Sequence, residues 1–435
     1  MKRILFISPL DRRVVANTRE QNMAEQCRAL GHETLSLTLA QNTSRTPWAV
    51  LRDSLSWRVQ SSDANLVIRI DPLLNPCTGL QTNLADDGHL AAPGSGIGPE
   101  KARYAKRRLV SVLSPLGVLR DVTIIPTFLL HAVRLGRFDL CIAYGPWAAC
   151  VGWLLRRLGR VGVLVYDDQD YEPAIMCNQV RQRWAAFLER AMMQRANAVV
   201  SVGGRLAALR RLQTGREVDV VANGFRAYSP SASTENAQAR GHEFTLIYVG
   251  NVVGWSGLDT VVAALPEVLA SGQTLRVVIV GDGLPGYVAG LRAQVQSLGL
   301  RELVRFVGRV PNDQIGEWLA QADVGLALFR PEPYRRYAFP LKVVEYMAAG
   351  LAVLGTTDTE TADILNRHGS GIAVPFDIRG IAQGILRLAT DAALREQCRR
   401  RALLAAPAYW WSVLAERELA IAEAASARCG RAAVA

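Results

Sequence analysis

Short apolar runs alternate with longer amphipathic segments in two parts of this 435-residue chain. The first part contains RILFIS (3–8), DLCIAY (139–144) and VGVLVY (161–166), and the second contains FTLIYVG (244–250), LRVVIVG (275–281) and LAVLG (351–355). A continuous apolar run is typical of a parallel strand that is buried on both faces, and strand–helix alternation builds a doubly wound sheet. The sequence therefore predicts an α/β fold with two tandem Rossmann-like doubly wound parallel-sheet domains, which face a cleft.

Two changes in composition divide the chain. Residues 72–108 are rich in Gly, Pro, Asn and Asp and end in a basic stretch, so we expect a loop-like insertion in the first domain. Residues 227–242 lack apolar periodicity and are expected to be a linker. The expected domains are 1–226 and 243–406, and a long amphipathic helix is expected within 407–435.

The net charge of +11 indicates an anionic partner, which could be a nucleic acid, a phosphorylated small molecule or an acidic membrane surface. A nucleic-acid reader is disfavoured because no aromatic side chains stand out among the basic stretches. The seven cysteines are scattered without a CxxC pair, which favours a reducing compartment and disfavours zinc. The apolar run near Met1 is too short for a secretory signal, and no stretch is long enough to span a membrane. We therefore expect a cytoplasmic protein.

The segment FPLKVVEYMAAG (339–350) combines helix signals with a charged pair. Pro340 stands where helices often begin and Gly350 where they often end. Lys342 and Glu345 lie three residues apart and therefore share a face of the expected helix. One interpretation is a solvated surface pair, which is the usual role of such charges. The other is a ligand site in which Lys342 and the helix N-terminus bind phosphate and Glu345 binds a ribose diol.

Glycine residues follow several strands of the second domain. Glycine lets the backbone approach a ligand closely, and the carboxyl ends of parallel strands meet at one edge of a sheet. We therefore predict a phosphate-binding edge that includes Gly250, Gly281, Gly283 and Gly308.

The stretch YDDQDYEP (166–173) follows a buried strand and contains three aspartates. Asp170, Asp168 and Asp167 are, in that order, the candidates for a general base in the first domain. The alternative is that they cap the segment that follows, as Asp commonly does.

Taken in order, four segments of the second half resemble a known family: IYVGNVVGWSGLDTVVAAL, LRVVIVGDG, VRFVGRVPNDQIGEWLAQADVGLALF and FPLKVVEYMAAGLAVLGT. They resemble the nucleotide-sugar domain of GT-B glycosyltransferases of family 4 (group 1), and most closely the subgroup with P-x-K-x-x-E-Y-M-A-A-G. The resemblance covers nearly all of 243–425 and is fainter in the first half. It implies transfer of a sugar from a nucleotide-diphosphate-sugar donor to an acceptor hydroxyl, with retention and without a cofactor or essential metal. It also implies that the last helix crosses back to the first domain.

The resemblance assigns roles position by position. Glu345 matches the ribose-binding second Glu of the family's E-x7-E signature, and the first Glu falls at Tyr337. The family's diphosphate-binding Arg and Lys fall at Asn251 and Ser256, so Lys342 is the expected replacement, with Arg335 and Arg336 nearby. The implied catalytic residues are Lys342, Asp170 and Asp168. The implied donor-binding residues are Glu345, Gly250, Asn251, Gly281, Gly283, Gly308, Arg309, Arg330, Pro340 and Leu341.

Other interpretations stay open at this point. Asp168-Gln169-Asp170 spells the DxD metal motif of the other glycosyltransferase fold, which the tandem domains disfavour. The implied acceptor is a glycan or lipid-linked glycan, and basic segments at 101–108 and 156–163 suit an anionic membrane surface as well as a solvated loop. The alternative functions are a nucleotide-sugar 2-epimerase of the same fold and a catalytically degenerate nucleotide-sugar-binding partner protein.

Overall fold

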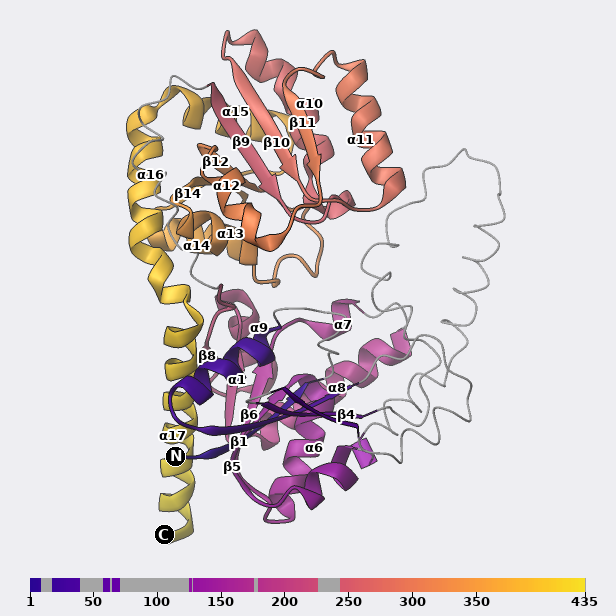
Figure 1. Cartoon of the computed structure of the whole chain (residues 1–435), viewed down its shortest axis with the longest axis vertical. Coiled ribbons are helices and arrows are strands. Elements are labelled where there is room, and N and C mark those ends of the chain that lie inside the picture. The colour runs from indigo at the N-terminus through magenta and orange to yellow at the C-terminus, as the bar shows by residue number, and fades with distance from the viewer. Residues whose placement is uncertain are drawn as a thin grey trace, which may run out of the picture. The chain divides into compact units, whose positions relative to one another are not determined.

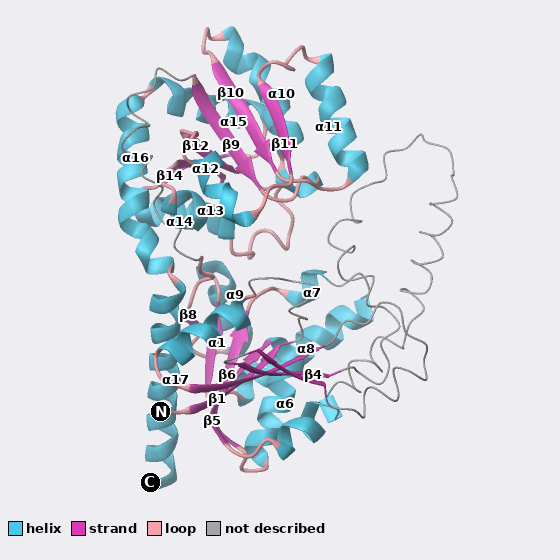
Figure 2. Ribbon diagram, viewed as in Figure 1, coloured by secondary structure: helices cyan, strands magenta, loops and turns pink. Residues whose placement is uncertain are grey.

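The computed structural model describes residues 1–8, 18–39, 58–62, 65–70, 125–126, 128–175, 179–225 and 243–434. The chain forms two compact units, of which the first comprises Met1–Ala222 with Leu414–Ala435 and the second Asn223–Val413. Each unit is a sheet with helices packed on it (Figures 1 and 2). The predicted insertion at 72–108 and the predicted linker at 227–242 lie outside the described residues.

The first unit contains an eight-stranded sheet in the order β3-β4-β2-β1-β5-β6-β7-β8. Its strands pair in parallel except β3, which is antiparallel to β4. The strands are β1 (Arg3–Ser8), β2 (Glu33–Leu39), β3 (Arg58–Ser62), β4 (Asn65–Ile70), β5 (Phe138–Tyr144), β6 (Val161–Asp168), β7 (Ala198–Ser201) and β8 (Asp219–Val220). The helices include α1 (Arg19–Ala29), α6 (Gly145–Arg157), α7 (Glu172–Ile175), α8 (Gln179–Arg195) and α9 (Gly204–Thr214).

The second unit contains a parallel six-stranded sheet in the order β11-β10-β9-β12-β13-β14. The strands are β9 (Phe244–Val249), β10 (Leu275–Val280), β11 (Val304–Gly308), β12 (Val324–Ala327), β13 (Ala352–Thr356) and β14 (Gly371–Val374). The helices are α10 (Leu258–Ala270), α11 (Pro285–Ser297), α12 (Ile315–Leu319), α13 (Leu341–Ala348), α14 (Glu360–His368), α15 (Ile378–Thr390) and α16 (Ala392–Ala405). The two sheets confirm the predicted tandem Rossmann-like fold.

The central strands are buried because their side chains are apolar on both faces of the sheet. Every residue of β13 and of β12 is buried, and so are five of the six residues of β1. Helices that carry one apolar stripe then cover each face, as α15 does with Ile381, Ile385 and Leu388. This layering leaves the ends of the strands as the places where polar side chains can gather.

The last helix, α17, runs from Trp411 to Val434. It lies within the predicted range of 407–435 and begins only at Trp411, because residues Ala406–Tyr409 form a separate 3₁₀ turn that contains Pro407. From Leu414 onward the helix belongs to the first unit. Of the described residues, no helix is long and apolar enough to cross a membrane.

Candidate functional site

The helix α13 is fixed over the end of β9 by Tyr346. The backbone N–H of Val249 donates a hydrogen bond of 2.8 Å to the Tyr346 hydroxyl. Gly325 in β12 makes room for this ring, since a Cβ at that position would lie 2.3 Å from it. The first turn of α13, which carries Lys342, is therefore held where β9 ends.

The ammonium group of Lys342 lies among aromatic rings. Its Nζ is 3.9 Å from the ring centre of Tyr248, 5.2 Å from that of Phe329 and 5.6 Å from that of Trp255. A Cβ placed on Gly250 would lie 3.4 Å from the same Nζ, so the backbone after β9 is close to the amine. Nζ is buried and finds no hydrogen-bond partner within the described part of the chain. Aromatic faces attract a cation but do not accept hydrogen bonds as oxygen does, so this amine lacks the partner that buried charges need.

Burial changes the protonation of both charged residues of α13. It lowers the pKa of Lys342 to about 7, with Glu345 opposing the shift and the positive charge of Arg335 adding to it. Burial also raises the pKa of Glu345 to about 7, against the attraction of Lys342. The solvated-pair interpretation is therefore disfavoured, because an exposed pair would keep ordinary pKa values. Pairs of perturbed titratable groups of this kind are typical of functional sites.

Glycines after the strands of the second unit form hydrogen bonds between neighbouring strand ends and let these backbones approach closely. Gly281 donates from its N–H to the carbonyl of Gly308 at 2.8 Å, and Gly250 donates to the carbonyl of Val280 at 3.0 Å. A Cβ on Gly281 would lie 2.0 Å from the Gly250 oxygen, and one on Gly283 would lie 1.9 Å from the Val252 oxygen. Gly281 and Gly283 are therefore explained by close packing of the strand ends, and Gly250 alone of the four is beside Lys342.

The other predicted donor-binding side chains are in different settings. Arg330 forms an ion pair of 2.6 Å with Asp259 in α10 and donates to the Gly254 carbonyl at 3.3 Å. Asn251, Arg309 and Leu341 are exposed, and Pro340 is buried at the start of α13. Arg330 thus links the turn at Gly254 to α10. The Arg335 guanidinium lies over the Trp255 ring, 3.7 Å from its centre, and its positive charge helps to lower the pKa of Lys342.

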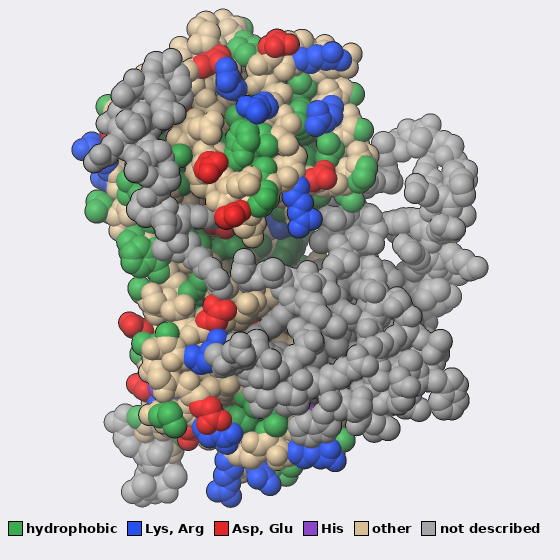
Figure 3. All heavy atoms as spheres, in the orientation of Figure 1, with side chains coloured by type: hydrophobic (Ala, Val, Ile, Leu, Met, Phe, Trp, Pro, Cys, Tyr) green, Lys and Arg blue, Asp and Glu red, His purple; other side chains and the backbone are tan. Residues whose placement is uncertain are grey.

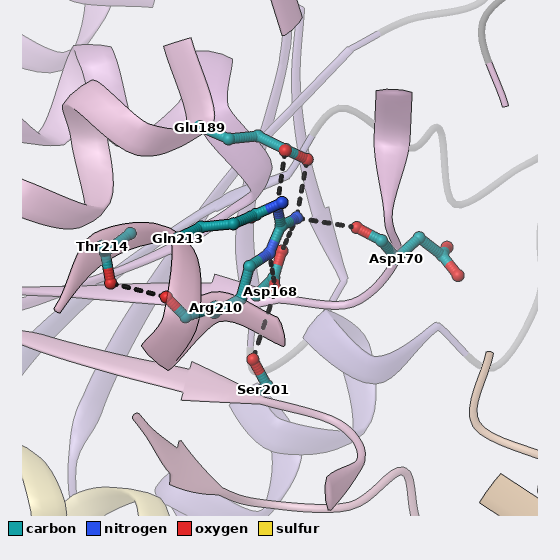
Figure 4. A network of polar contacts seen from close by, with 7 residues as sticks. All are labelled: Asp168, Asp170, Glu189, Ser201, Arg210, Gln213 and Thr214. Atoms are coloured by element: carbon teal, nitrogen blue, oxygen red, sulfur yellow. Dashed lines mark hydrogen bonds and ion pairs between the residues drawn. The ribbon is translucent and has the colours of Figure 1, made fainter. Parts of the chain in front are cut away.

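Asp168 in the first unit is engaged in a buried network around Arg210 (Figure 4). It accepts hydrogen bonds from Arg210 Nε at 2.8 Å and Nη2 at 3.0 Å, and from Ser201 Oγ at 3.2 Å. The same guanidinium donates to Glu189 at 2.7 and 2.8 Å. Asp168 is therefore an ion-pair residue and not a cap of the following segment. The Asp170 side chain points away from Arg210, so the two carboxylates of the DxD sequence do not converge in this structure (Figure 4).

Asp167 belongs to a second buried network, which is centred on Arg19. Arg19 Nε is 2.6 Å from Asp167, its Nη2 is 3.2 Å from Glu418 of α17, and its Nη1 donates to the Ala222 carbonyl at 2.6 Å. Burial and the charge of Asp167 raise the pKa of Glu418 to about 8, although Arg19 opposes this. Arg19, at the start of α1, thus links this helix to the end of β6 and to α17.

This network predicts a pH dependence of stability. The folded pKa of Glu418, about 8, lies above its ordinary value of 4.5, so the folded state binds more protons between these values. Stability should therefore fall as pH rises from about 5 to about 8. We expect Glu418→Gln, which cannot ionise, to reduce this slope in urea unfolding measured at several pH values; Glu345, whose folded pKa is raised to about 7, accounts for part of the remainder. An unchanged slope in that variant would contradict the assignment.

Sequence reasoning missed the aromatic environment and both arginine networks. Tyr248 lies in β9, Trp255 in the 3₁₀ turn after β9 and Phe329 in the segment after β12, so no helical or strand spacing relates the three rings. One signal was present, since Glu418 occupies the apolar face of α17 together with Leu414 and Ala415. A carboxylate among residues of a buried stripe indicates a buried partner.

Comparison with known proteins defines the class to which this geometry belongs. Residues 243–391 match the family described as Glycosyl transferases group 1. In structure, the chain is similar to HepE of Anabaena in complex with UDP-glucose, with a TM-score of 0.60 and 20% identity over 98% of this chain and 100% of that one. Residues 243–391 are therefore similar to group 1 glycosyl transferases, and the chain has the GT-B fold.

Two curated relatives are similar over a smaller share of their length. The phosphatidyl-myo-inositol mannosyltransferase of Propionibacterium freudenreichii is 26% identical over 55% of this chain and 59% of its own length. The D-inositol 3-phosphate glycosyltransferase of Jonesia denitrificans is 29% identical over 48% of this chain and 51% of its own length. The chain thus matches about half the length of these relatives.

Proposed function

We propose that this chain is a glycosyltransferase that moves a sugar from a nucleoside-diphosphate sugar to an acceptor hydroxyl. The observation that carries the proposal is the buried Lys342 amine, which lies beside the Gly250 backbone and has no hydrogen-bond partner in the described part of the chain. A buried amine without an acceptor is costly unless a ligand supplies one. The diphosphate supplies oxygen acceptors there, and the N-terminal end of α13 adds positive potential. Glu345, one turn further along α13, accepts hydrogen bonds from the ribose diol.

The chemistry follows from this placement. When the bond between the anomeric carbon and the diphosphate breaks, negative charge grows on the leaving phosphate oxygen. A fixed cation aimed at that oxygen lowers the barrier, often by several kcal/mol. We assign this role to Lys342, without a metal ion.

We propose that the reaction retains the anomeric configuration. In that case the acceptor attacks on the leaving-group face and its proton passes to the departing diphosphate, so no protein base is required. The engagement of Asp168 by Arg210 supports this route. Asp170, whose side chain points away from Arg210, is the carboxylate to test for an inverting reaction (Figure 4).

UDP-glucose is the first donor to test, because HepE of Anabaena, which shares this fold, was solved with it. We also place the chain in the P-x-K-x-x-E-Y-M-A-A-G subgroup, since Lys342 and Glu345 are the two charged positions of that motif. Domain 243–406 would hold the donor and domain 1–226 the acceptor.

For the acceptor we propose a lipid-linked glycan at the inner face of a membrane. The names of the two curated relatives identify inositol phosphate and phosphatidylinositol as what those proteins act on, so both take anionic acceptors. The basic balance of this chain, +11, suits an acceptor of that charge.

Nucleotide binding tests the proposal directly. We expect one of UDP, GDP, ADP, TDP and CMP to raise the melting temperature, in the presence of either Mg²⁺ or EDTA, because it binds only the folded state. Glu345→Gln should abolish most of this shift while the melting temperature without ligand changes little. Binding in Glu345→Gln as tight as in the wild type would remove Glu345 from the site. Release of UDP and free sugar without an acceptor would favour the epimerase, and the absence of any shift would contradict the proposal.

A further inference from the structure

Strand β14 is the last strand at one edge of the sheet in the second unit. It pairs in parallel with β13, and no other strand of the described part of the chain lies beside it. The carbonyl of Val374 accepts a hydrogen bond of 2.9 Å from the N–H of Thr357, on the side of β13. Backbone groups of successive residues in a strand point to opposite sides. The N–H and C=O groups of Gly371 and Ala373 therefore point toward the free edge.

This edge is accessible and apolar. Every residue of β14 is half-buried, whereas every residue of β13 is buried. A groove of about 360 Å³ lies between β14 and α15, and its lining includes Ile372, Ala373 and Val374 of the strand and Gly380 and Gly384 of the helix. Gly384 brings the helix close to the strand, since a Cβ there would lie 2.9 Å from the Val374 side chain. Free backbone groups beside such a groove are a template for an added strand.

One row of α15 residues gives the groove a positive charge. Arg379, Gln383 and Arg387 are exposed, line the groove and follow one another at intervals of four residues, so they lie on one face of the helix. The acidic residue at the groove is Asp377, which caps α15 by accepting a hydrogen bond of 2.7 Å from the N–H of Gly380. The helix N-terminus thus already engages this carboxylate.

The rest of the visible surface of the second unit has no comparable arrangement. On the face drawn in Figure 3, its Lys and Arg side chains are interspersed with hydrophobic and acidic ones. Attraction of acidic groups to the groove is therefore expected from the arginine row itself and not from a uniformly basic surface.

We propose that the β14 edge binds an extended acidic segment of a partner protein, which joins the sheet as a further strand. Backbone groups of this segment pair with those of Gly371 and Ala373, and its carboxylates contact Arg379 and Arg387. These two arginines are eight positions apart, which is about 12 Å along a helix. Strand residues four positions apart are about 13 Å apart on one face. The segment should therefore carry acidic residues at this spacing.

A second copy of the chain is a poorer partner for this edge. Antiparallel pairing of two β14 strands would place the α15 helices of both copies on the same face of the joined sheet. The arginine rows would then face each other, and like charges brought together oppose association. An acidic segment instead compensates the charge of the row.

The backbone part of the proposal is tested on the full chain with a fluorescein-labelled peptide in which Glu and Val alternate over seven residues. Ala373→Pro removes an outward N–H and leaves the pairing with β13 in place, because proline is tolerated where the N–H of an edge strand faces away from its neighbour. Ala373→Val is the control, since it keeps the N–H and has a high strand propensity.

The charge part is tested with a double variant that leaves the backbone unchanged. Arg379→Gln with Arg387→Gln neutralises the row on α15. Arg276→Gln with Arg400→Gln makes the same change at two other arginines of the second unit, whose side chains are 52% and 71% exposed. This test stays valid even if Ala373→Pro lowers the melting temperature.

Fluorescence anisotropy measures the affinity, and hydrogen exchange measures the protection of the Ala373 amide. We expect the wild type to bind the peptide, to bind it more weakly as salt is added, and to exchange the Ala373 amide more slowly when the peptide is bound. Ala373→Pro should bind about tenfold more weakly, as the loss of a backbone hydrogen bond does. The arginine double variant should bind about tenfold more weakly, about threefold for each charge. Both controls should stay within about twofold of the wild type.

Three outcomes would overturn the proposal. A wild-type chain that does not bind the peptide has no acidic-segment site at this edge. Equal affinities of Ala373→Pro and Ala373→Val, with no protection of the Ala373 amide, would show attraction by charge without strand addition. Self-association of the wild type in sedimentation velocity that Ala373→Pro abolishes would assign the edge to a second copy. None of these measurements uses a nucleotide, so their result is independent of the proposed transfer reaction.

Discussion

Arg210→Met is expected to lower the free energy of unfolding by about 3–5 kcal/mol, as the loss of one partner from a buried ion pair does. Arg210 is 1% exposed and holds Asp168 on one side and Glu189 on the other. Without the guanidinium, two buried carboxylates lie close together with no cation between them. Each must then be protonated or drawn toward water, and both processes oppose folding. Urea unfolding followed by circular dichroism measures this loss.

A neutral version of the network provides the control. The triple variant Arg210→Met, Asp168→Asn, Glu189→Gln removes all three charges together and should recover most of the stability that Arg210→Met loses. If the triple variant is no more stable than Arg210→Met, shape and not charge explains the loss.

The single variant Asp168→Asn distinguishes a structural role of this residue in the ion-pair network from a role as catalytic base. We expect it to destabilise the fold by about 1–3 kcal/mol, because it weakens the charge-assisted hydrogen bonds to Arg210. Turnover per folded molecule should stay close to that of the wild type. A stable variant without turnover would instead make Asp168 a catalytic base.

Lys342→Met is expected to weaken nucleotide-diphosphate binding about a hundredfold without destabilising the empty protein. A charge-assisted hydrogen bond to phosphate in a buried site contributes about 3 kcal/mol, which is about two factors of ten. Among the residues that the structure describes, the Lys342 amine has no hydrogen-bond acceptor, so its removal costs no such bond. Met has a similar length and packs well against the rings of Tyr248, Trp255 and Phe329.

Isothermal titration calorimetry with UDP measures the affinity, and a thermal melt without ligand measures the stability. The melting temperature of Lys342→Met should equal that of the wild type or exceed it by a few degrees, because burial lowers the pKa of this amine to about 7 and so disfavours its charged form. Arg276→Gln is the matched control, since Arg276 is an exposed cation near the start of β10, away from the strand ends at Lys342. Unchanged affinity in Lys342→Met would exclude the diphosphate role, and a large fall in melting temperature would make Lys342 a structural residue.

The pattern of the sequence determined the fold class and the position of α13. Apolar runs of four to eight residues that alternate with longer amphipathic segments are typical of strands buried on both faces, so this alternation leaves few other architectures. Pro340 and Gly350 delimit α13 through backbone preferences, which act locally and are therefore readable in one dimension. The pairing of Lys342 with Glu345 follows from helical spacing alone, and the structure places both on that helix.

Only the tertiary structure decided what those charges contact. From the sequence, Asp167 and Asp168 could be bases or caps, but their partners Arg19 and Arg210 lie 148 and 42 positions away in the chain. Likewise, the glycines after the strands resemble a phosphate-binding edge, but Gly281 and Gly283 are required by neighbouring backbone and Gly250 alone lies beside Lys342. The ionic state of a side chain depends on burial and on charges brought close by folding. Local sequence preferences contain neither the burial of a side chain nor the charges around it. The sequence therefore determined which residues are able to bind a ligand, and the fold determined which of them are already engaged by other side chains.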